Sequence, residues 1–242
     1  MKIVAIIQAR MGSTRLPGKV LMKLIGEPIL AHVIKRTSRA KTISNIVVAT
    51  TVNQMDNVIV QFCQENGWLC FRGNEQDVLD RYYKAAVEYQ ADVIVRITSD
   101  CPLIEPEIID RVVGEYLENP SLDYVSNTLD PRTFPRGLDV EVVSFEALRC
   151  AWEEDNNYEW REHVTPYIYR NPDKFSVKGV KHGEDLSYMR WTVDTIEDFR
   201  FVSTIYNHFR HNNFSWMDVL TLLKQHPEWI EINRGIEQKE IP

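Results

Sequence analysis

Short runs of consecutive apolar residues alternate with longer amphipathic segments through the first half of the chain. Unbroken apolar runs are typical of strands buried on both faces, and segments of helical period fit helices packed against such strands. The pattern predicts strands at 3–9, 45–51, 68–71 and 92–98, and helices at 28–39, 55–66, 77–89 and 106–118. Pro28 and Pro106 stand at the start of two predicted helices, where proline is favoured. This order predicts a parallel sheet with helices on both faces.

The pattern is less regular after about residue 123. The segment LDVEVV at 138–143 alternates with a period of two, which predicts an antiparallel or half-exposed strand. Two more strands are predicted at 175–180 and 189–193, the second returning to the sheet, and helices at 145–154, 159–170, 196–209 and 215–224. We therefore predict one α/β domain over residues 1–242. Its Rossmann-like, mostly parallel sheet carries a small inserted α+β subregion at about 123–188.

Composition argues against several classes of protein. A net charge of −7 and a pI near 5.5 disfavour a nucleic-acid-binding surface. No apolar run approaches the length of a membrane span, and Met1 and Lys2 lead into a strand-like run rather than a signal peptide. The four cysteines lack zinc-site spacing, so we expect reduced thiols in a cytoplasmic protein. His208 and His211 fit a polar helix end better than a metal site.

Charged residues gather directly after the first predicted strand, in the stretch QARMGSTRLPGK at residues 8–19. In an open α/β sheet the first strand-to-helix turn commonly binds phosphate. Gly12 and Gly18 do not give the G-x-G-x-x-G spacing of a dinucleotide site. The P-loop pattern also fails, because the glycines are one residue too far apart and Val20 replaces the hydroxyl.

Side chains therefore have to supply much of the anion binding in this loop. Arg10 and Arg15 can each donate two hydrogen bonds to a phosphate, and Lys19 adds a compact charge. Pro17 stiffens the turn and lowers the entropy cost of holding these cations together. The stretch predicts a phosphate-binding loop, and a solvated surface loop is the alternative.

Two aspartates follow strand-like runs and are the predicted metal ligands. Asp100 follows VRITS and Asp194 follows MRWTV. The carboxyl ends of sheet strands face the same crevice as the first loop. Because Mg²⁺ is held by one or two carboxylates together with phosphates, this pair fits a nucleotide-bound magnesium ion. The alternative is that each aspartate caps the helix that follows it, which suits Asp194 better than Asp100.

Six sequence blocks, in order, resemble the cytidylyltransferases that activate acidic sugars. The family includes the KDO and acylneuraminate CMP-sugar synthetases, and the resemblance is strongest to its spore coat polysaccharide biosynthesis protein F branch. The blocks are QARxGSTRLPGK (8–19), FRGNEQDVLDRY (71–82), RITSDCPLI (96–104), FPRGLDVEV (134–142), REHVTPYI (161–168) and WTVDTIED (191–198). KDO-type enzymes have glycine where Ser99 precedes Asp100. This departure fits the spore-coat branch and leaves the sugar open.

The resemblance implies a reaction in which CTP and a sugar give a CMP-sugar and pyrophosphate. It also implies Mg²⁺, a nucleotide-diphospho-sugar transferase fold and a homodimer, with the 123–188 subregion serving the sugar or the dimer. The nucleotide-binding residues it implies are Gln8, Arg10, Gly12, Ser13, Thr14, Arg15, Lys19, Arg72, Asp77 and Asp80. Those it implies for the sugar are Arg136, Asp139, Glu141, Glu162 and His163. Those it implies for catalysis are Arg15, Lys19 and Asp100, with Asp100 and Asp194 on the metal.

Several of these roles have structural alternatives. Arg72 can pair with Asp77 or Asp80, and Asp139 and Glu141 can form an ordinary solvated strand face. The dipeptide 162–163 can be a structural ion pair. For the whole chain, the alternatives are a nucleotidyltransferase for another triphosphate, a nucleotide-sugar-dependent glycosyltransferase and a non-catalytic nucleotide-binding regulator. The glycosyltransferase lacks support, because the sequence at 99–101 has no Asp-x-Asp.

Overall fold

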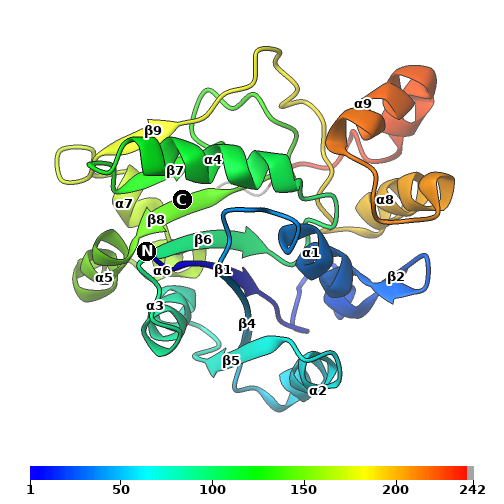
Figure 1. Ribbon diagram of the computed structural model, residues 1–242. Helices are drawn as coiled ribbons and strands as arrows, with labels where there is room; N and C mark the ends of the chain where they lie inside the picture. The colour runs from blue at the N-terminus through cyan, green and yellow to red at the C-terminus, as the bar shows by residue number, and fades with distance from the viewer. Residues whose placement is uncertain (239–242) are drawn as a thin grey trace.

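The computed structural model describes residues 1–238, and its centre is a seven-stranded sheet (Figure 1). The strand order is β5-β4-β1-β6-β8-β7-β9. The strands are β1 Ile3–Gln8, β4 Asn45–Thr51, β5 Leu69–Gly73, β6 Val93–Thr98, β7 Tyr124–Ser126, β8 Glu141–Ser144 and β9 Val177–Gly179. β8 pairs antiparallel with both of its neighbours, and the other neighbouring strands pair in parallel. The predicted mostly parallel α/β sheet is confirmed.

Helices cover both faces of this sheet (Figure 1). Ile3, Ala5 and Ile7 of β1 join one hydrophobic cluster, and Val4 and Ile6 join the other. The first cluster includes residues of α1, α2, α4, α8 and α9, and the second includes residues of α3, α5 and α7. The helices are α1 Ile29–Thr37, α2 Asn57–Glu65, α3 Val78–Glu88, α4 Pro106–Glu118, α5 Phe145–Glu154, α6 Tyr158–His163, α7 Pro166–Tyr169, α8 Ile196–Phe209 and α9 Trp216–Gln225. Burial on both faces explains the unbroken apolar run of β1.

The predicted strand at 189–193 is wrong. The segment makes a single bridge, between Arg190 and Arg136, and no ladder. Its apolar side chains Trp191 and Val193 are fully buried. The backbone of Val193 donates to the carbonyl of Asp100 at 2.8 Å, which ties this segment to the end of β6. The apolar pattern therefore reflected burial rather than sheet pairing.

The predicted helix at 159–170 is broken into α6 and α7. Val164 has a φ of 73°, and Pro166 begins α7. Proline has no backbone N–H to continue the hydrogen bonding of a preceding helix. The remaining predicted strands and helices are present, with ends shifted by at most three residues.

Several short elements were not predicted, because each has between two and six residues and shows no clear periodicity. They are the hairpin β2 Lys23–Leu24 and β3 Glu27–Pro28, strand β7, and the 3₁₀ helices η1 Lys19–Leu21, η2 Gln54–Asp56 and η3 Pro227–Ile232. The hairpin turn places Ile25 and Gly26 at positive φ, 44° and 89°. Two consecutive positive φ values are characteristic of the tight turns that suit β-hairpins.

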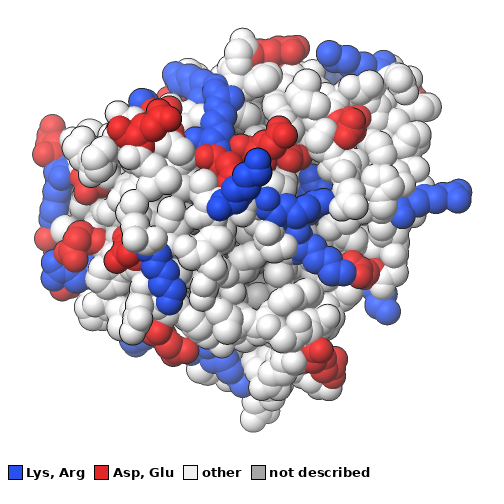
Figure 2. All heavy atoms as spheres, viewed as in Figure 1, with Lys and Arg blue, Asp and Glu red and all other residues white. Residues whose placement is uncertain are grey.

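Acidic and basic side chains are mixed over the viewed face of the molecule (Figure 2). The four cysteines are free, with no disulfide between them. In residues 1–238, no helix is both long enough and apolar enough to cross a membrane.

Candidate active site

Three charged residues from distant parts of the chain meet at the carboxyl ends of the central strands. The Lys19 ammonium donates to Asp100 Oδ2 at 2.8 Å, to Asp194 Oδ1 at 2.8 Å and to the Val193 carbonyl at 2.9 Å. The Lys19 side chain is 10% exposed, whereas the carboxylates are 23% and 16% exposed. The predicted metal-binding aspartates therefore lie together, with a cation between them and a partly open side. We call Lys19, Asp100 and Asp194 the open cluster.

The carboxylates of the open cluster favour the charged form of Lys19, and Lys19 favours the ionised form of Asp100. Burial lowers the pKa of Lys19, but the two carboxylates outweigh this effect and the pKa is raised overall. Burial raises the pKa of Asp100, yet Lys19 and the Thr98 hydroxyl, which donates to Asp100 Oδ1 at 2.6 Å, leave it below its ordinary value. At neutral pH Asp100 is therefore an ionised carboxylate with a low affinity for a proton.

Asp194 also contacts two guanidinium groups. Its Oδ2 accepts a hydrogen bond from Arg190 at 2.7 Å and forms an ion pair with Arg15 Nη2 at 2.9 Å. Arg15 is 38% exposed and Arg190 is only 6% exposed. Two cations of the 8–19 stretch, Arg15 and Lys19, thus reach the same carboxylate, so the loop folds over the crevice at the sheet edge. The loop is not simply a solvated surface turn.

Neither aspartate caps the helix that follows it. Thr195 caps α8, because its hydroxyl accepts from the Asp198 amide. Glu105 is the residue before α4. The capping alternative is therefore wrong for Asp194 and for Asp100.

Backbone hydrogen bonds fix the shape of the loop. The amides of Ser13 and Gly18 both donate to the Met11 carbonyl at 2.9 Å, and the Met11 amide donates to Asp56 Oδ1 at 2.7 Å. Gly18 has a φ of 72°, a conformation that glycine adopts without steric cost. It turns the chain into η1, the short helix that buries Lys19.

The remaining residues of the loop lie around its rim. Gly12 and Thr14 are exposed, and the Ser13 hydroxyl faces the Leu16 amide at 3.5 Å. Arg10 is 3.4 Å from Glu162 of α6, and Gln8 Oε1 is 3.5 Å from an Arg96 nitrogen. The structure thus places Glu162 beside the loop, from a helix 150 residues away in the sequence. His163 lies in the last turn of the same helix.

Arg72 anchors the chain between β4 and α2. Its guanidinium donates to the carbonyls of Thr51 and Asn53, at 2.9 and 3.0 Å, and to the Asn57 side chain at 2.8 Å. Pairing with Asp77 or Asp80, the alternative for this residue, is therefore wrong. A contact between Arg72 and a nucleotide stays a prediction.

Asp77 and Asp80 connect α3 to the segment carrying α5 and α6. Asp77 caps α3 and accepts two hydrogen bonds from Arg161, at 2.9 and 2.7 Å. Asp80 is buried; it accepts a hydrogen bond from the Trp152 indole at 2.9 Å and forms an ion pair with Lys84 at 2.9 Å. Their roles toward the nucleotide likewise stay predictions.

Glu141 lies inside the sheet rather than on a solvated face. It stands opposite Arg96 in the β6–β8 register and forms an ion pair with it. Its second oxygen accepts from the Tyr124 hydroxyl at 2.6 Å and from Thr165. The solvated-face alternative is therefore wrong for Glu141. A direct contact with the sugar requires one of these buried bonds to break, and it stays a prediction. We call Arg96 and Glu141 the closed pair.

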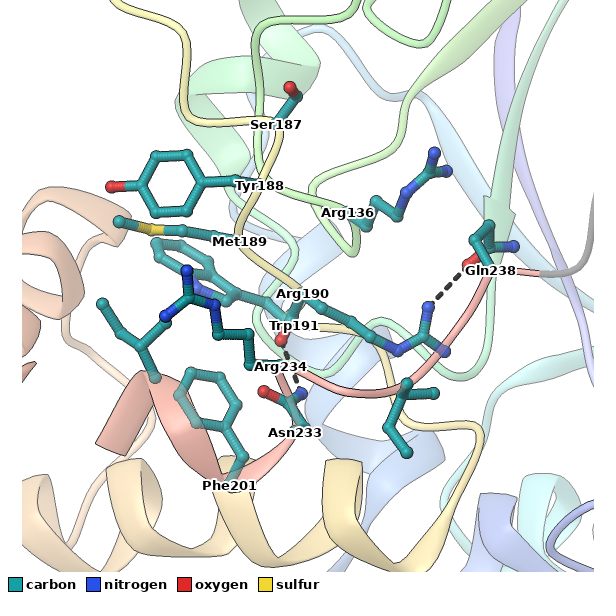
Figure 3. Close-up of a pocket in the computed structure, with 12 residues that line it drawn as sticks. Arg136, Ser187, Tyr188, Met189, Arg190, Trp191, Phe201, Asn233, Arg234 and Gln238 are labelled. Carbon is teal, nitrogen blue, oxygen red and sulfur yellow. Dashed lines mark hydrogen bonds between the residues drawn. The ribbon is translucent and has the colours of Figure 1, made fainter. Parts of the chain in front are cut away.

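Asp139 and Arg136 lie further along the same segment. Asp139 forms an ion pair with Arg132 and is 31% exposed. Arg136 lines a pocket between segment 187–191 and the C-terminal segment 230–238, together with Arg190 and Arg234 (Figure 3). Burial, Arg132 and Arg190 all lower its pKa. Within residues 1–238 the Arg136 guanidinium has no hydrogen-bond or ion-pair partner, so it can receive an anion.

Sequence reasoning missed several residues that hold the site together. They are Thr98, Asp56, Arg190, Asp198 and Asn233. Asp198 falls within the WTVDTIED block, so its position carried a signal. Asp56 is the last residue of η2 and Asn233 stands in a turn, and neither lies in one of the six blocks.

The open cluster has the donor chemistry that magnesium requires. Carboxylate oxygens are preferred ligands of Mg²⁺, which usually takes one or two of them and completes its shell with phosphate oxygens and water. Both carboxylates are partly exposed, and the Lys19 ammonium between them shows that the position favours positive charge. Across residues 1–238, no group of three or more His, Cys, Asp or Glu side chains is arranged to hold a metal by itself. The pair therefore fits an ion delivered with phosphates.

A family model described as cytidylyltransferase matches residues 4–240. The chain belongs to this family. It is 33% identical over 238 residues to the spore coat polysaccharide biosynthesis protein SpsF of Bacillus subtilis, covering 93% of this chain and 95% of that one. It is 44% identical over 241 residues to an uncharacterised protein of Methanocaldococcus jannaschii, covering 99% and 97%. The sequence-based assignment to the cytidylyltransferases and their spore-coat branch is confirmed, and the chain is a nucleotidyltransferase.

Solved structures agree with the family assignment. A cytidylyltransferase from Leptospira borgpetersenii superposes with a TM-score of 0.92 at 35% identity, covering 99% of this cytidylyltransferase and all of the other chain. A CMP-2-keto-3-deoxy-manno-octonic acid synthetase complexed with CTP superposes with a TM-score of 0.68 at 18% identity, covering 86% and 99%. The second likeness shows a shared fold.

Proposed function

We propose that this cytidylyltransferase transfers CMP from CTP to a sugar hydroxyl, releases pyrophosphate and uses Mg²⁺ held by Asp100 and Asp194. The observation that carries the proposal is the meeting of these two carboxylates with Lys19 beneath the cationic loop. Transfer of a nucleotidyl group needs in-line attack of the hydroxyl on the α-phosphate. Such reactions depend on positioning and on charge stabilisation more than on covalent chemistry of the protein.

The loop supplies the cations for the triphosphate. Arg10 and Arg15 are each 38% exposed, so both can leave their present carboxylate partners for phosphate oxygens. Lys19 is held more firmly, because its ammonium also donates to the main-chain carbonyl of Val193. We assign Lys19 and Arg15 to the charge of the departing pyrophosphate. The bound Mg²⁺ supplies further positive charge at the phosphates.

Asp100 serves to hold the cation rather than to remove a proton. Its depressed pKa makes it a weak general base in this state. A general base works best with a pKa near the operating pH. The proton of the attacking hydroxyl is therefore expected to leave to solvent or to a phosphate oxygen.

The pocket at Arg136 is the proposed sugar side of the site. Its unpartnered, half-buried guanidinium favours an acidic sugar over a neutral one. A role in surface or spore-coat polysaccharide synthesis is supported by the similarity to the spore coat polysaccharide biosynthesis protein of Bacillus subtilis. We further propose a cytoplasmic homodimer, as the family resemblance implies.

The test is pyrophosphate release from each of the four nucleoside triphosphates with Mg²⁺, against a panel of sugar acids, neutral sugars and amino sugars. Release with CTP and one sugar acid supports the full proposal. Release with a different triphosphate keeps the chemistry and contradicts the choice of base. CTP binding without release across the panel favours the regulator. Release of a nucleoside diphosphate from a nucleotide-sugar favours the glycosyltransferase.

A further inference from the structure

Asp198 is a fully buried carboxylate outside the open cluster, and five donors surround it. Arg190 donates to its Oδ1 at 2.9 Å and to its Oδ2 at 3.2 Å. The Asn233 amide donates to Oδ1 at 2.9 Å. The backbone amides of Asp194 and Thr195 donate to Oδ2 at 3.0 and 3.1 Å. A buried carboxylate is tolerated only when it is paired and hydrogen-bonded in this way.

The partners of Asp198 lead directly to the open cluster. Arg190 uses the Nη2 that contacts Asp198 to contact Asp194 Oδ2 as well. Asp198 also holds the Asp194 backbone amide. The side chain and the main chain of Asp194 are therefore both fixed by one buried pair, Arg190 and Asp198.

The C-terminal segment completes this arrangement. The side-chain amide of Asn233 donates two hydrogen bonds, one to Asp198 Oδ1 at 2.9 Å and one to the Arg190 carbonyl at 2.8 Å. Asn233 is 4% exposed. Gln238 accepts from Arg190 Nη1 at 2.6 Å, and the dashed lines in Figure 3 mark this bond and the one from Asn233 to the Arg190 carbonyl. The C-terminal segment, which follows α9, thus contacts Arg190, and Arg190 in turn contacts Asp194.

We propose that Arg190, Asp198 and Asn233 are positioning residues that hold Asp194 in the orientation the open cluster requires. The proposal rests on the proposed function of Asp194 as a metal-binding carboxylate. Groups that fix a metal-ligating side chain typically change metal affinity or activity by 10- to 100-fold when they are removed. The C-terminal segment is accordingly part of the active site, although Asn233 itself stands behind Asp194 rather than in the crevice.

A purely structural role for this network has different consequences. If it served only to stabilise the fold, substitutions would lower the melting temperature and leave the metal affinity of the folded protein unchanged. Positioning instead changes metal affinity and kcat, while the KM for CTP stays within a few-fold because the loop cations are intact.

The test compares Asn233→Asp with Asn213→Asp in the full chain. The first substitution keeps the size of the side chain, but removes its two donors and places a second carboxylate beside Asp198. The second makes the same change at an exposed asparagine bonded to Arg39, away from the site. Mn²⁺, substituted for Mg²⁺ in the presence of CTP, is titrated by electron paramagnetic resonance. Melting temperature, kcat and KM are measured alongside it.

We expect Asn233→Asp to weaken Mn²⁺ binding and lower kcat by about 10- to 100-fold, with Asn213→Asp unchanged. Wild-type Mn²⁺ affinity in a folded Asn233→Asp variant overturns the proposal. If that variant does not fold, Arg190→Lys decides, because lysine keeps the charge but cannot contact both carboxylates in the same way. Wild-type Mn²⁺ affinity in folded Arg190→Lys likewise overturns it.

A crystal structure of the variant separates failure of this proposal from failure of the proposed function. Wild-type protein that binds no Mn²⁺ with CTP contradicts the metal role of Asp194. Even then, the distance from Asp194 Oδ1 to the Lys19 ammonium, 2.8 Å here, reports on positioning. We expect the Asp194 carboxylate to turn away from Lys19 in Asn233→Asp. An unmoved carboxylate overturns the positioning role.

Discussion

The closed pair and the open cluster place the same kinds of charge on neighbouring parts of one sheet, yet they differ in what surrounds them. In the closed pair, Arg96 and Glu141 are 13% and 8% exposed, and further hydroxyl donors complete the carboxylate. In the open cluster the carboxylates of Asp100 and Asp194 are 23% and 16% exposed. The Glu141 carboxylate has partners on both of its oxygens within the protein, whereas the open cluster remains accessible to a ligand.

The origin of the charges explains this difference. The closed pair joins residues on adjacent strands in direct register, so the sheet itself fixes their separation. The charges of the open cluster come from three segments. Lys19 lies in the loop after β1, Asp100 follows the end of β6, and Asp194 follows segment 189–193, which forms no strand. Buried ion pairs are compensated only when their hydrogen bonding is complete. Charges at strand ends are partly exposed, so water can complete their hydrogen bonding and they can exchange partners. Position along the strands therefore separates charges that are paired inside the sheet from charges that stay partly exposed at its carboxyl end.

The largest effect is expected at Asp100. Asp100→Asn keeps the shape of the side chain, but removes one of the two negative charges that would hold Mg²⁺. We expect kcat to fall about 10³-fold, which corresponds to roughly 4 kcal/mol of transition-state stabilisation. The melting temperature should change little, because the side chain is partly solvated. Steady-state pyrophosphate release and thermal melting measure the two quantities. Near-wild-type turnover with Mg²⁺ present would remove Asp100 from the mechanism.

The next largest effect is expected at the closed pair, and there it falls on stability. Glu141→Gln leaves the Arg96 guanidinium buried without its carboxylate. Breaking a buried pair from one side typically costs about 3–5 kcal/mol, which at this chain length lowers the melting temperature by roughly 6–15 °C. Glu146→Gln, at an exposed side chain of α5, is the matched control and should leave melting unchanged. If Glu141→Gln melts like the wild type but loses turnover, the closed pair belongs to the site after all.

Arg15 should give an intermediate effect on the open cluster. Arg15→Ala removes one cation from the triphosphate, while Lys19 and Arg190 still hold Asp194. We expect the KM for CTP to rise about 10-fold, in line with the loss of one charge-assisted contact. Arg15→Lys retains the charge and should recover part of the loss, because only the two-pronged geometry is missing. An unchanged KM in the alanine variant would place the triphosphate elsewhere.

The sheet was predictable from sequence because its signals are local. The apolar run of β1 and the segments 45–51 and 92–98 follow directly from burial on both faces. The loop cations and the two aspartates were found for a related reason, since strand ends in an open sheet share one edge. Position after a strand therefore predicted that the loop cations and Asp100 would lie at one end of the sheet. Asp194 lies there for a different reason, because the Val193 amide donates to the Asp100 carbonyl and no strand forms at 189–193.

What could not be predicted depends on contacts between distant segments. Nothing near Glu141 indicates that Arg96 stands opposite it, because register is set by the whole sheet. Residues 189–193 look like a strand, since burial gives the same apolar pattern whether or not a ladder forms. Asn233 stands in a short turn with no periodicity, and its role depends on meeting Asp198, 35 residues earlier. The sequence thus predicts the fold and the charged residues near the strand ends, but it does not predict which partner each charged residue contacts.

The smallest effect is expected at an ion pair that is neither closed nor part of the site. Lys35 of α1 and Glu27 lie 2.5 Å apart, and their side chains are 46% and 45% exposed. Exposed pairs contribute at most about 1 kcal/mol, since water and salt screen them. Lys35→Ala should therefore lower the free energy of unfolding by less than about 1 kcal/mol in urea titrations, and leave kcat and KM unchanged. Burial, rather than the distance between charges, would then account for the contrast with Glu141→Gln. A loss as large as that of Glu141→Gln would contradict this explanation, because it would show that an exposed pair can stabilise the fold as strongly as a buried one.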